Sequence, residues 1–367
     1  MSFESSFSGK TVLVTGHTGF KGSWLTAWLI RLGANVVGAS VDVPSNPSGF
    51  EASAIGSLIK DHRLDISDVN GVYDLVKDIK PDYVFHLAAQ ALVRPSYQNP
   101  IETMTTNAIG SASILDALRR LNRPVVALMI TSDKAYDNVE WLWGYRETDR
   151  IGGKDPYSAS KGMAELVIKT YFESYFKNRE SNVKIGIARA GNVIGGGDWA
   201  TDRIVADCMR AWSDDQVVDI RSPDSTRPWQ HVLEPLSGYL HLAQSLTEVS
   251  DVHGEAFNFG PSGHQDYSVR ELITEMSNYW SNVRWNDVSD DTGKLHEANL
   301  LKLNCDKALH SLNWLPTLGF QETVKMTVDW YRNYYRDPKK SMFDFTCSQI
   351  DEYTKIADSR SISWATK

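Results

Sequence analysis

Tyr157 and Lys161 are the two side chains of this sequence with the clearest chemical potential. They stand four residues apart in the segment DPYSASKG, a spacing that places both on one face of a helix. A lysine ammonium group beside a phenol stabilises the phenolate, and so lowers the pKa of a tyrosine from about 10 toward neutrality. Tyr157 is therefore predicted to act as a base near neutral pH. The alternative is an unreactive pair on a surface helix, because this spacing is common by chance.

A polar segment, Thr131-Ser132-Asp133-Lys134, follows the apolar run 125–130. Such a position is the carboxyl end of a predicted strand, where ligands bind in open α/β sheets. Ser132 is therefore predicted to bind a substrate hydroxyl whose proton Tyr157 removes. The carbon that bears this hydroxyl then gives a hydride to a nicotinamide cofactor, which is dehydrogenase chemistry.

Gly16, Gly19 and Gly22 follow the apolar run 11–15 and lead into a helix predicted over 24–32. Glycines in a strand-to-helix turn let the backbone amides approach a pyrophosphate at the positive end of the helix. The order Lys21-Gly22-Ser23 reverses the Gly-Lys-Ser order of a nucleotide-hydrolysing phosphate loop. A dinucleotide is thus predicted rather than ATP. His17 lies inside this turn, where it either tunes cofactor affinity or points outward into solvent.

Asp42 stands 20 residues after Gly22, at the end of the strand predicted over 35–41. A carboxylate there accepts hydrogen bonds from the adenosine ribose and repels a 2′-phosphate, which favours NAD over NADP. Two alternatives remain open, since Ser40 could occupy this position and Lys21 could tolerate the extra phosphate charge. The predicted cofactor contacts are Gly16, His17, Gly19, Phe20, Lys21, Gly22, Asp42, Asp65, Ile66, Leu87, Ala88, Ala89, Tyr157 and Lys161.

Two of these contacts have a competing structural explanation. Asp65 follows the region of the next strand end and is either an adenine contact or a turn residue. Ala88 and Ala89 follow the strand predicted over 83–87, where small side chains leave room for a dinucleotide or simply allow tight packing.

The elements that must position these residues alternate between strand and helix. Strands are predicted over 11–15, 35–41, 83–87, 125–130 and 183–188, separated by helix-length segments. This alternation predicts an α/β fold with a Rossmann-type, doubly wound parallel sheet and a smaller C-terminal substrate domain. The predicted division is a cofactor domain over 1–190, with a returning segment near 230–259, a substrate domain over 191–340 with helices at 269–280 and 318–335, and a peripheral tail over 341–367.

Composition excludes several other classes of protein. The 367 residues include 38 Lys and Arg against 46 Asp and Glu, and the resulting charge of −8 argues against general affinity for nucleic acid or anionic membranes. No apolar window of about 18 residues exists, and the first residues lack the pattern of a secretory signal. The cysteines Cys208, Cys305 and Cys347 are too scattered for a disulfide framework, and no metal-ligand spacing occurs. A reducing cytoplasm is the expected location, without a metal.

Several long segments, in one order over residues 8–335, resemble the extended short-chain dehydrogenases/reductases, and among them the CDP-glucose 4,6-dehydratases. The segments are TGHTGFKGSWL, FHLAAQALVRPSY, TSDKAYDN, GYRETD, DPYSASKG, ARAGNVIGGGDWA, RPWQHVLEPLSGYL and MTVDWYR. The resemblance implies a tightly held NAD, a nucleotide-sugar substrate, and conversion of CDP-D-glucose to CDP-4-dehydro-6-deoxy-D-glucose. It also implies a homo-oligomer, a dimer or a tetramer.

The resemblance gives roles to Asp133 and Lys134. Loss of water across C5 and C6 needs an acid for the C6 hydroxyl and a base for the C5 proton, which oxidation at C4 has made acidic. Asp133 is the predicted acid and Lys134 the predicted base. In the related dTDP-glucose dehydratases, the position that resembles Lys134 holds a glutamate base, so the lysine here is a departure from those relatives. As a base Lys134 must be neutral, which burial beside Lys161 would favour; alternatively it stays charged and stabilises the enolate.

The same resemblance predicts a substrate site and one more cofactor contact. An arginine fork and polar groups are expected at the diphosphate, and an aromatic ring at the base. The predicted substrate contacts are Ser96, Ser132, Asn192, Arg203, Arg227, Trp229 and His231, and Asn107 is the added cofactor contact. Competing interpretations are a 4-epimerase, a 4,6-dehydratase for another nucleotide, or an inactive cofactor sensor, although a sensor is expected to have lost Ser132, Tyr157 or Lys161.

Overall fold

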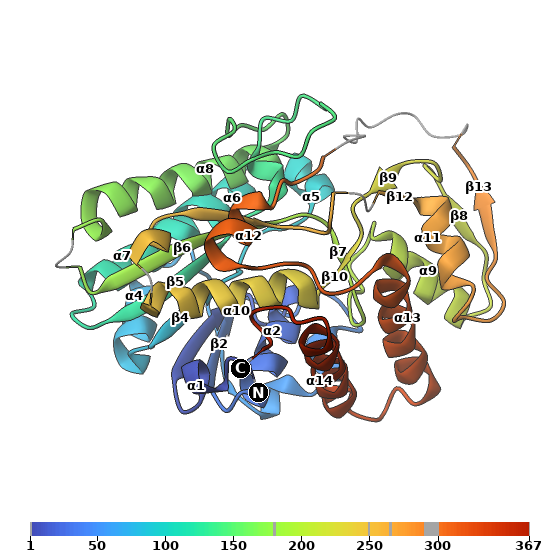
Figure 1. The fold of residues 1–367 in the computed structure, drawn as a ribbon, viewed down its shortest axis with the longest axis horizontal. Helices are drawn as coiled ribbons and strands as arrows, with labels where there is room; N and C mark the ends of the chain where they lie inside the picture. The colour runs from blue at the N-terminus through green and yellow to red at the C-terminus, as the bar shows by residue number, and fades with distance from the viewer. Residues whose placement is uncertain (1, 179–180, 249, 264–265, 290–300, 367) are drawn as a thin grey trace.

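The fold is built on one large parallel sheet (Figure 1). The computed structural model describes residues 2–178, 181–248, 250–263, 266–289 and 301–366. Within these ranges seven strands form a sheet in the order β11-β6-β5-β4-β1-β2-β3, and every pair is parallel. The strands are β1 (Thr11–Thr15), β2 (Asn35–Ser40), β3 (Lys60–Arg63), β4 (Tyr83–His86), β5 (Val125–Ile130), β6 (Val183–Ala190) and β11 (Ala256–Phe259). The predicted Rossmann-type doubly wound sheet is confirmed.

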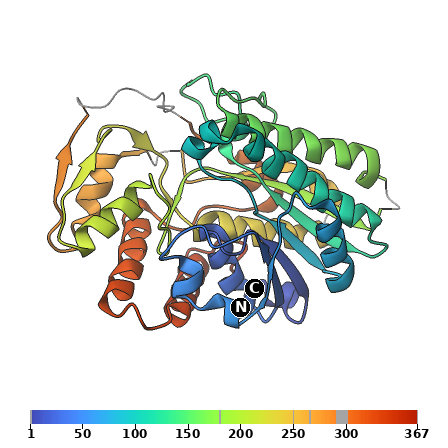
Figure 2. The ribbon, with the colours of Figure 1, turned by 180° about the vertical axis from the view of Figure 1, so that it is seen from behind.

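Helices cover both faces of the sheet because its central strands are apolar on both faces. Along β1, Val12 and Val14 belong to one core while Leu13 belongs to the other. Helices α2 (Phe20–Arg31) and α10 (Leu233–Glu248) pack in the first core, and α4 (Val69–Ile79), α7 (Gly110–Arg120) and α8 (Pro156–Tyr171) pack around the second. Figure 2 shows the α4, α7 and α8 layer from the other side.

The strand order places the carboxyl ends of β1 and β4 at the switch point of the sheet. From β1 the chain runs outward through β2 to β3, then returns to the opposite side of β1 as β4. In open α/β sheets the crevice outside such a point is where ligands bind. The glycine turn after β1 and the segment after β4 both open there.

Two strands of the sheet were not among the predicted ones. β3 has the sequence KDHR and all four residues are exposed, so this edge strand carries no apolar alternation to reveal it. β11 follows α10 and pairs with β6, which brings residues 256–259 back to the sheet after the chain has left it.

The substrate-side lobe lies at one end of the molecule, on the right in Figure 1. It is made of α9 (Ile204–Ser213), α11 (Val269–Met276), α13 (Phe320–Arg336) and the short strands β8 (Val218–Ile220), β9 (Thr226–Arg227), β12 (Tyr267–Ser268) and β13 (Trp285–Asp287). β7 (Val193–Ile194) pairs in parallel with β10 (Gln230–His231) where the chain passes between the sheet and this lobe. The division into domains stays a prediction.

Short helices complete the described chain. They are α1 (Glu4–Phe7), α3 (Gly49–Ala52), η1 (Ile55–Ser57), α5 (Val93–Gln98), α6 (Pro100–Met104), η2 (Thr105–Ile109), η3 (Asp133–Ala135), η4 (Phe172–Phe176), η5 (Ser250–Val252) and α12 (Asp306–Leu312). None of the helices in the described ranges has both the length and the apolar character needed to cross a bilayer.

The chain end differs from the predicted peripheral tail. Residues 343–359 form α14 (Phe343–Ser359), which packs against α2 and buries Ile350 and Tyr353 completely. Trp364 stacks on Phe3 with ring centroids 5.5 Å apart, so the two ends of the chain meet (Figures 1 and 2). The tail is thus part of the core next to α2, and one buried face of α14 lies among its polar residues.

Candidate active site

A cleft of about 1810 Å³ runs along the carboxyl ends of the strands, between the sheet and the substrate-side lobe. It collects residues from the segments after β1, β2, β3, β4, β5 and β6. Among the predicted site residues, those lining the cleft are Gly16, Gly19, Phe20, Lys21, Gly22, Asp42, Asp65, Ile66, Leu87, Ala88, Ala89, Ser132, Asp133, Lys134, Tyr157, Lys161, Asn192, Arg203, Arg227 and Trp229. His17, Ser96, Asn107 and His231 do not line it.

The glycine turn is packed so closely that side chains have no room there. Gly16 has φ +76°, and a Cβ on it would lie 2.6 Å from the backbone nitrogen of Ala88. A Cβ on Gly22 would lie 2.0 Å from the carbonyl oxygen of Gly16, so the first turn of α2 sits directly under the loop. The cleft is therefore bordered by bare backbone at the start of a 12-residue helix, a surface that fits a pyrophosphate.

His17 does not point outward into solvent, and its influence on cofactor affinity stays a prediction. Its side chain is fully buried and does not line the cleft, and its ring packs edge-on against Phe50. Nε2 lies 2.9 Å from Oδ1 of Asp61 on β3, and Nδ1 lies 2.9 Å from Oγ of Ser40 on β2. Desolvation lowers the pKa of His17, although Asp61 opposes that shift. The residue thus ties the glycine turn to the neighbouring strands.

Both acidic residues predicted for the adenosine end lie at the cleft, in exposed positions. Asp42 contributes its backbone carbonyl to a 2.6 Å hydrogen bond from Thr18 Oγ1, and its side chain is exposed. Asp65 accepts hydrogen bonds of 2.8 Å from both the backbone nitrogen and the hydroxyl of Ser67. Asp65 thus makes turn contacts in this structure, and its adenine contact stays a prediction.

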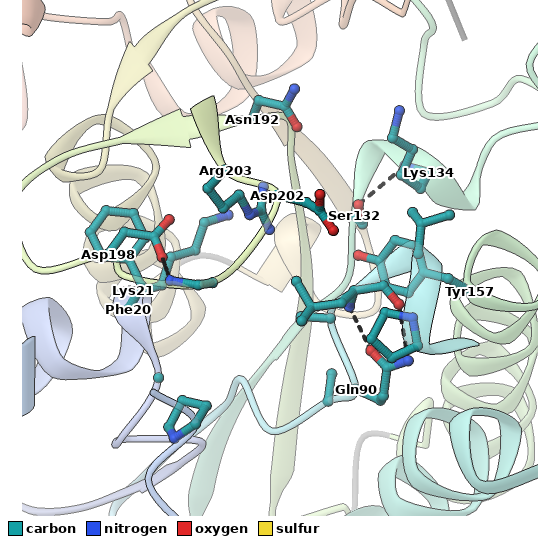
Figure 3. Close-up of a pocket in the computed structure, with 18 of the residues that line it drawn as sticks. Phe20, Lys21, Gln90, Ser132, Lys134, Tyr157, Asn192, Asp198, Asp202 and Arg203 are labelled. Atoms are coloured by element: carbon teal, nitrogen blue, oxygen red, sulfur yellow. Dashed lines mark hydrogen bonds between the residues drawn. The ribbon is translucent and has the colours of Figure 1, made fainter. Parts of the chain in front are cut away.

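Ser132 and Tyr157 lie beside each other in the cleft (Figure 3), and Asp133 lines the same cleft. The Ser132 hydroxyl donates a 2.9 Å hydrogen bond to Oδ1 of Asp133 and accepts one of 3.2 Å from the backbone nitrogen of Lys134. The Tyr157 phenol lies near Ser132, and this serine acts to lower the pKa of the phenol. These three side chains and that of Lys161 are each less than a tenth exposed. The phenol and the serine hydroxyl are thus placed to hold one substrate hydroxyl between them.

The electrostatics of Tyr157 differ from the sequence prediction. Desolvation raises the pKa of Tyr157 above its usual 10, and the effect of Ser132 only partly offsets the rise. Desolvation also lowers the pKa of Lys161 to about 8, opposed by the Glu165 carboxylate. Lys21 behaves in the same way, with its pKa lowered to about 8 by desolvation against the attraction of Asp133. The chain's own charges therefore do not produce the lowered phenol pKa that the spacing predicts.

Lys134 is less enclosed than predicted. Its side chain is only partly buried, and in Figure 3 its ammonium group points away from the Tyr157 ring. The burial beside Lys161 that would favour a neutral amine is absent at this position. Asn192 lies across the cleft from Lys134 in the same view, and Arg203 lies beside Lys21.

The predicted contacts outside the cleft have packing roles instead. Ser96 is fully buried and donates to the carbonyl of Val93 at 2.6 Å. Asn107 is buried and donates to Oγ of Ser160 at 2.7 Å, which joins the segment after β4 to α8. His231 is fully buried against Trp24, and desolvation lowers the pKa of its imidazole to about 3. The resemblance located these segments correctly near the cleft, but burial directs the three side chains elsewhere.

Among the charged residues of the cleft that were not predicted, Arg94, Asp202 and Arg221 form one cluster. Oδ1 of Asp202 lies 2.9 Å from Nη1 of Arg94 and 3.0 Å from Nη2 of Arg221, so it bridges the sheet side and the substrate-side lobe. Arg94 lies within the segment FHLAAQALVRPSY, and Asp202 directly precedes Arg203. Their nearness in the sequence to predicted site residues is the feature that indicates a place at the cleft. The described residues hold no group of three or more His, Cys, Asp or Glu suited to a metal ion.

Comparison with known proteins agrees with this geometry. A family model described as GDP-mannose 4,6 dehydratase matches residues 13–327. The chain is 46% identical to CDP-glucose 4,6-dehydratase of Salmonella typhimurium, over 90% of this chain and 92% of that protein. Among solved structures, the epimerase Mth375 of Methanothermobacter thermautotrophicus has a TM-score of 0.75 at 24% identity, covering 92% of this chain and 96% of its own.

A second solved structure has the same fold. The UDP-glucose 4-epimerase of Thermus thermophilus, in complex with NAD, has a TM-score of 0.72 at 23% identity, covering 88% of this chain and 99% of its own. By its matched length, its 46% identity to one relative and its fold, the chain belongs to the GDP-mannose 4,6 dehydratase family of extended short-chain dehydrogenases/reductases.

Proposed function

We propose that this protein is an NAD-dependent CDP-glucose 4,6-dehydratase, which converts CDP-D-glucose to CDP-4-dehydro-6-deoxy-D-glucose. The observation that carries the proposal is that Ser132, Asp133 and Tyr157 line one cleft, with Ser132 hydrogen-bonded to the Asp133 carboxyl group. Dehydrogenation alone needs only the hydroxyl, the phenol and the lysine. A buried carboxyl group bonded to the same serine adds the acid that water loss requires.

The glycine turn supports NAD as the cofactor, because its bare backbone at the start of α2 fits a pyrophosphate. Asp42 and Asp65 lie at the far end of the same cleft, where negative charge disfavours a 2′-phosphate. NAD bound there would supply the hydride acceptor for C4 and the hydride donor for C6 of the sugar, so that no external reductant is consumed.

The residues of the chain carry the proton transfers. Ser132 holds the C4 hydroxyl and Tyr157 takes its proton. Asp133, when protonated, gives its proton to the departing C6 hydroxyl, from a position where it already bonds Ser132. Lys134, if neutral, takes the proton from C5 and gives a proton back to C5 when hydride reaches C6; if charged, it stabilises the enolate oxygen at C4 while water takes and returns the C5 proton. Because desolvation raises the pKa of Tyr157, the positive charge of Lys161 is needed close to the phenol for its ionisation.

The diphosphate of the substrate is assigned to the cationic side of the cleft. Arg203, Arg227 and Asn192 line it, as do Arg94 and Arg221. Trp229, which lines the cleft near Arg227 and donates to the carbonyl of Tyr267 at 2.8 Å, is the proposed neighbour of the base. The choice of cytidine follows the 46% identical relative rather than any contact with a base.

The test is incubation of the purified protein with CDP-, dTDP-, GDP- and UDP-glucose, with NAD and without a reductant. Mass spectrometry should show loss of one water from CDP-glucose and from none of the other three. Water loss from a different nucleotide sugar would support the assignment of the protein as a 4,6-dehydratase and reject CDP-glucose as its substrate. An unchanged mass together with interconversion of glucose and galactose would identify a 4-epimerase.

Location and assembly are part of the same proposal. We infer a cytoplasmic enzyme of deoxysugar synthesis for the lipopolysaccharide O-antigen, supported by the free thiols of Cys208, Cys305 and Cys347. A homo-oligomer is supported by apolar side chains exposed on adjoining helices, with Ile101 on α6 exposed by 74% and Leu166 on α8 by 59%. Light scattering coupled to gel filtration should give a dimer or tetramer, whereas a monomer would reject this part.

A further inference from the structure

Thr131 and Tyr136, on either side of Ser132, Asp133 and Lys134, both bind one buried ion pair, Glu165–Arg189. We call residues 131–136 the catalytic loop. At its start, Thr131 Oγ1 donates a 2.5 Å hydrogen bond to Oε1 of Glu165. At its end, the hydroxyl of Tyr136 accepts a 2.7 Å hydrogen bond from Nη1 of Arg189. Ser132, Asp133 and Lys134 lie between these two anchors.

The anchors are connected because Glu165 and Arg189 bind each other. Nε of Arg189 lies 2.8 Å from Oε1 of Glu165, and Nη2 lies 3.0 Å from Oε2, which is a bidentate fork. Both side chains are 5% exposed. A buried bidentate pair satisfies its hydrogen bonds in one geometry, so it fixes both the separation and the relative orientation of the Glu165 and Arg189 side chains.

The ion pair joins the elements that carry the chemistry. Glu165 lies one helical turn after Lys161 on α8, the helix that also carries Tyr157. Arg189 lies on β6, beside β5, which leads into the catalytic loop. The Tyr136 hydroxyl continues the network by donating to Oδ1 of Asn258 on β11 at 2.8 Å. Four segments distant in sequence thus share one chain of hydrogen bonds.

We propose that Glu165 and Arg189 are positioning residues, which hold the catalytic loop in register with Tyr157 and Lys161. The inference rests on the proposed function, since the reaction needs Ser132 and Asp133 from the loop and Tyr157 from α8 to reach one sugar ring. Neither Glu165 nor Arg189 lines the cleft, so neither touches the substrate. Their effect on the reaction passes through Thr131 and Tyr136.

A positioning role differs from a purely structural one in what it changes. Displacing a catalytic group by about 1 Å costs about 100-fold in rate, without weakening contacts to distant parts of the substrate. The nucleotide and the cofactor bind elsewhere in the cleft, at the arginines and the glycine turn. A loss of register should therefore lower kcat while KM and NAD affinity stay the same.

The gentlest test uses Thr131, where the hydroxyl can be removed at constant shape. Thr131→Val should lower kcat for CDP-glucose about 10-fold, with KM and the NAD dissociation constant within about twofold of wild type. Thr131→Ser keeps the hydroxyl and should restore most of the rate. Equal rates for the valine and serine variants would overturn the proposal.

The stronger test removes the charge of Glu165. Glu165→Gln keeps the size of the side chain but leaves Arg189 without its fork, and should lower kcat about 100-fold with KM little changed. The matched control is Glu173→Gln, which breaks the exposed 2.7 Å pair with Lys177 beyond the end of α8 and should leave kcat unchanged. If Glu165→Gln does not fold, the Thr131 pair of variants decides.

A readout that does not depend on turnover separates this inference from the proposed function. Hydrogen exchange of the peptide covering residues 131–136 should speed up in Thr131→Val and not in Thr131→Ser. A wild-type protein inactive on CDP-glucose would reject the proposed function, and the exchange result would still decide the inference. Unchanged exchange in Thr131→Val would reject the inference even if CDP-glucose is the substrate.

Discussion

The Ser132 hydroxyl donates a 2.9 Å hydrogen bond to Oδ1 of Asp133. The residue assigned to the C4 hydroxyl is thus bonded to the residue assigned to the C6 hydroxyl, and oxidation and water loss share one buried pair. Lys134 joins this pair only through its backbone nitrogen, at 3.2 Å from Ser132 Oγ. Its side chain can therefore be changed without breaking the pair, which allows the steps to be separated.

Replacing the phenol should stop the first step. Tyr157→Phe removes the base and should lower kcat about 1000-fold, within the range typical of general base catalysis. Substrate affinity should change little, because the diphosphate contacts are remote. Steady-state rates with equilibrium binding of CDP-glucose check this, and unchanged turnover would contradict the assignment of Tyr157.

Truncating Lys134 should slow water loss and spare oxidation. Lys134→Ala leaves the backbone bond to Ser132 intact, so C4 oxidation should proceed while the product forms at least about 10-fold more slowly. Stopped-flow absorbance of the reduced cofactor, in a single turnover, should then show reduction followed by slow reoxidation. Equal slowing of both phases would count against a role at C5.

The glycine turn should not tolerate a methyl group at Gly16. A Cβ there would lie 2.6 Å from the backbone nitrogen of Ala88, and the residue has φ +76°. Gly16→Ala should weaken NAD binding more than about 10-fold, because the loops after β1 and β4 must separate. Titration calorimetry measures this, with Gly263→Ala as control, since a Cβ at Gly263 meets nothing within 4 Å. A Gly16→Ala variant that binds NAD with wild-type affinity would contradict the assignment of the glycine turn to the pyrophosphate.

Glu234 should make stability depend on pH in an unusual direction. Desolvation raises its pKa from 4.5 to about 7, although the backbone nitrogens of Thr317 and Leu318 and the Tyr353 hydroxyl donate to it. Between these pH values the folded state holds a proton that the unfolded chain releases. The contribution of Glu234 to the free energy of unfolding should therefore be greatest at and below pH 4.5. It should fall by up to about 3 kcal/mol as the pH rises through 7.

Glu234→Gln tests that sign. The variant lacks a titratable group, so the fall between pH 5 and 8 should be reduced relative to wild type in urea unfolding curves. Gln also accepts fewer hydrogen bonds, so the variant should be less stable overall by about 1 to 3 kcal/mol. An identical pH slope in both proteins would show that Glu234 does not titrate in this window.

The packed chain end should contribute to global stability. Trp364 is 3% exposed and stacks between Phe3 and Tyr353. Trp364→Ala should cost about 3 to 5 kcal/mol, as for other buried aromatic side chains. Trp143→Ala, at a residue 72% exposed, is the control and should change stability by less than about 0.5 kcal/mol. A small effect for Trp364 would restore the idea of a peripheral tail.

Local sequence patterns were sufficient for the buried strands. Runs such as 125–130 are apolar throughout because both faces of that strand are covered, so β5 is recovered without error. β3 was not predicted because an exposed edge strand can be entirely polar. α14 was not predicted because its buried face, which includes Ile350 and Tyr353, is interrupted along the sequence by polar residues. These elements depend on long-range packing that no local window contains.

The site divides in the same way. Spacing placed Tyr157, Lys161, Ser132 and the glycines at one cleft, because helix geometry and strand ends determine those positions. Spacing could not determine where a side chain points, so Ser96, His17 and His231 turned out to be buried outside the cleft. Glu165 lies four residues after Lys161 and so continues the helix face of Tyr157 and Lys161, which the sequence spacing alone shows.

The most direct test of the account follows one hydrogen atom. CDP-D-glucose carrying deuterium at C4 is incubated with the protein and NAD, and the product is examined by NMR and mass spectrometry. The account predicts loss of one water and recovery of the deuterium at C6. Retention of the water, or a product whose C6 carries only solvent hydrogen, would contradict it.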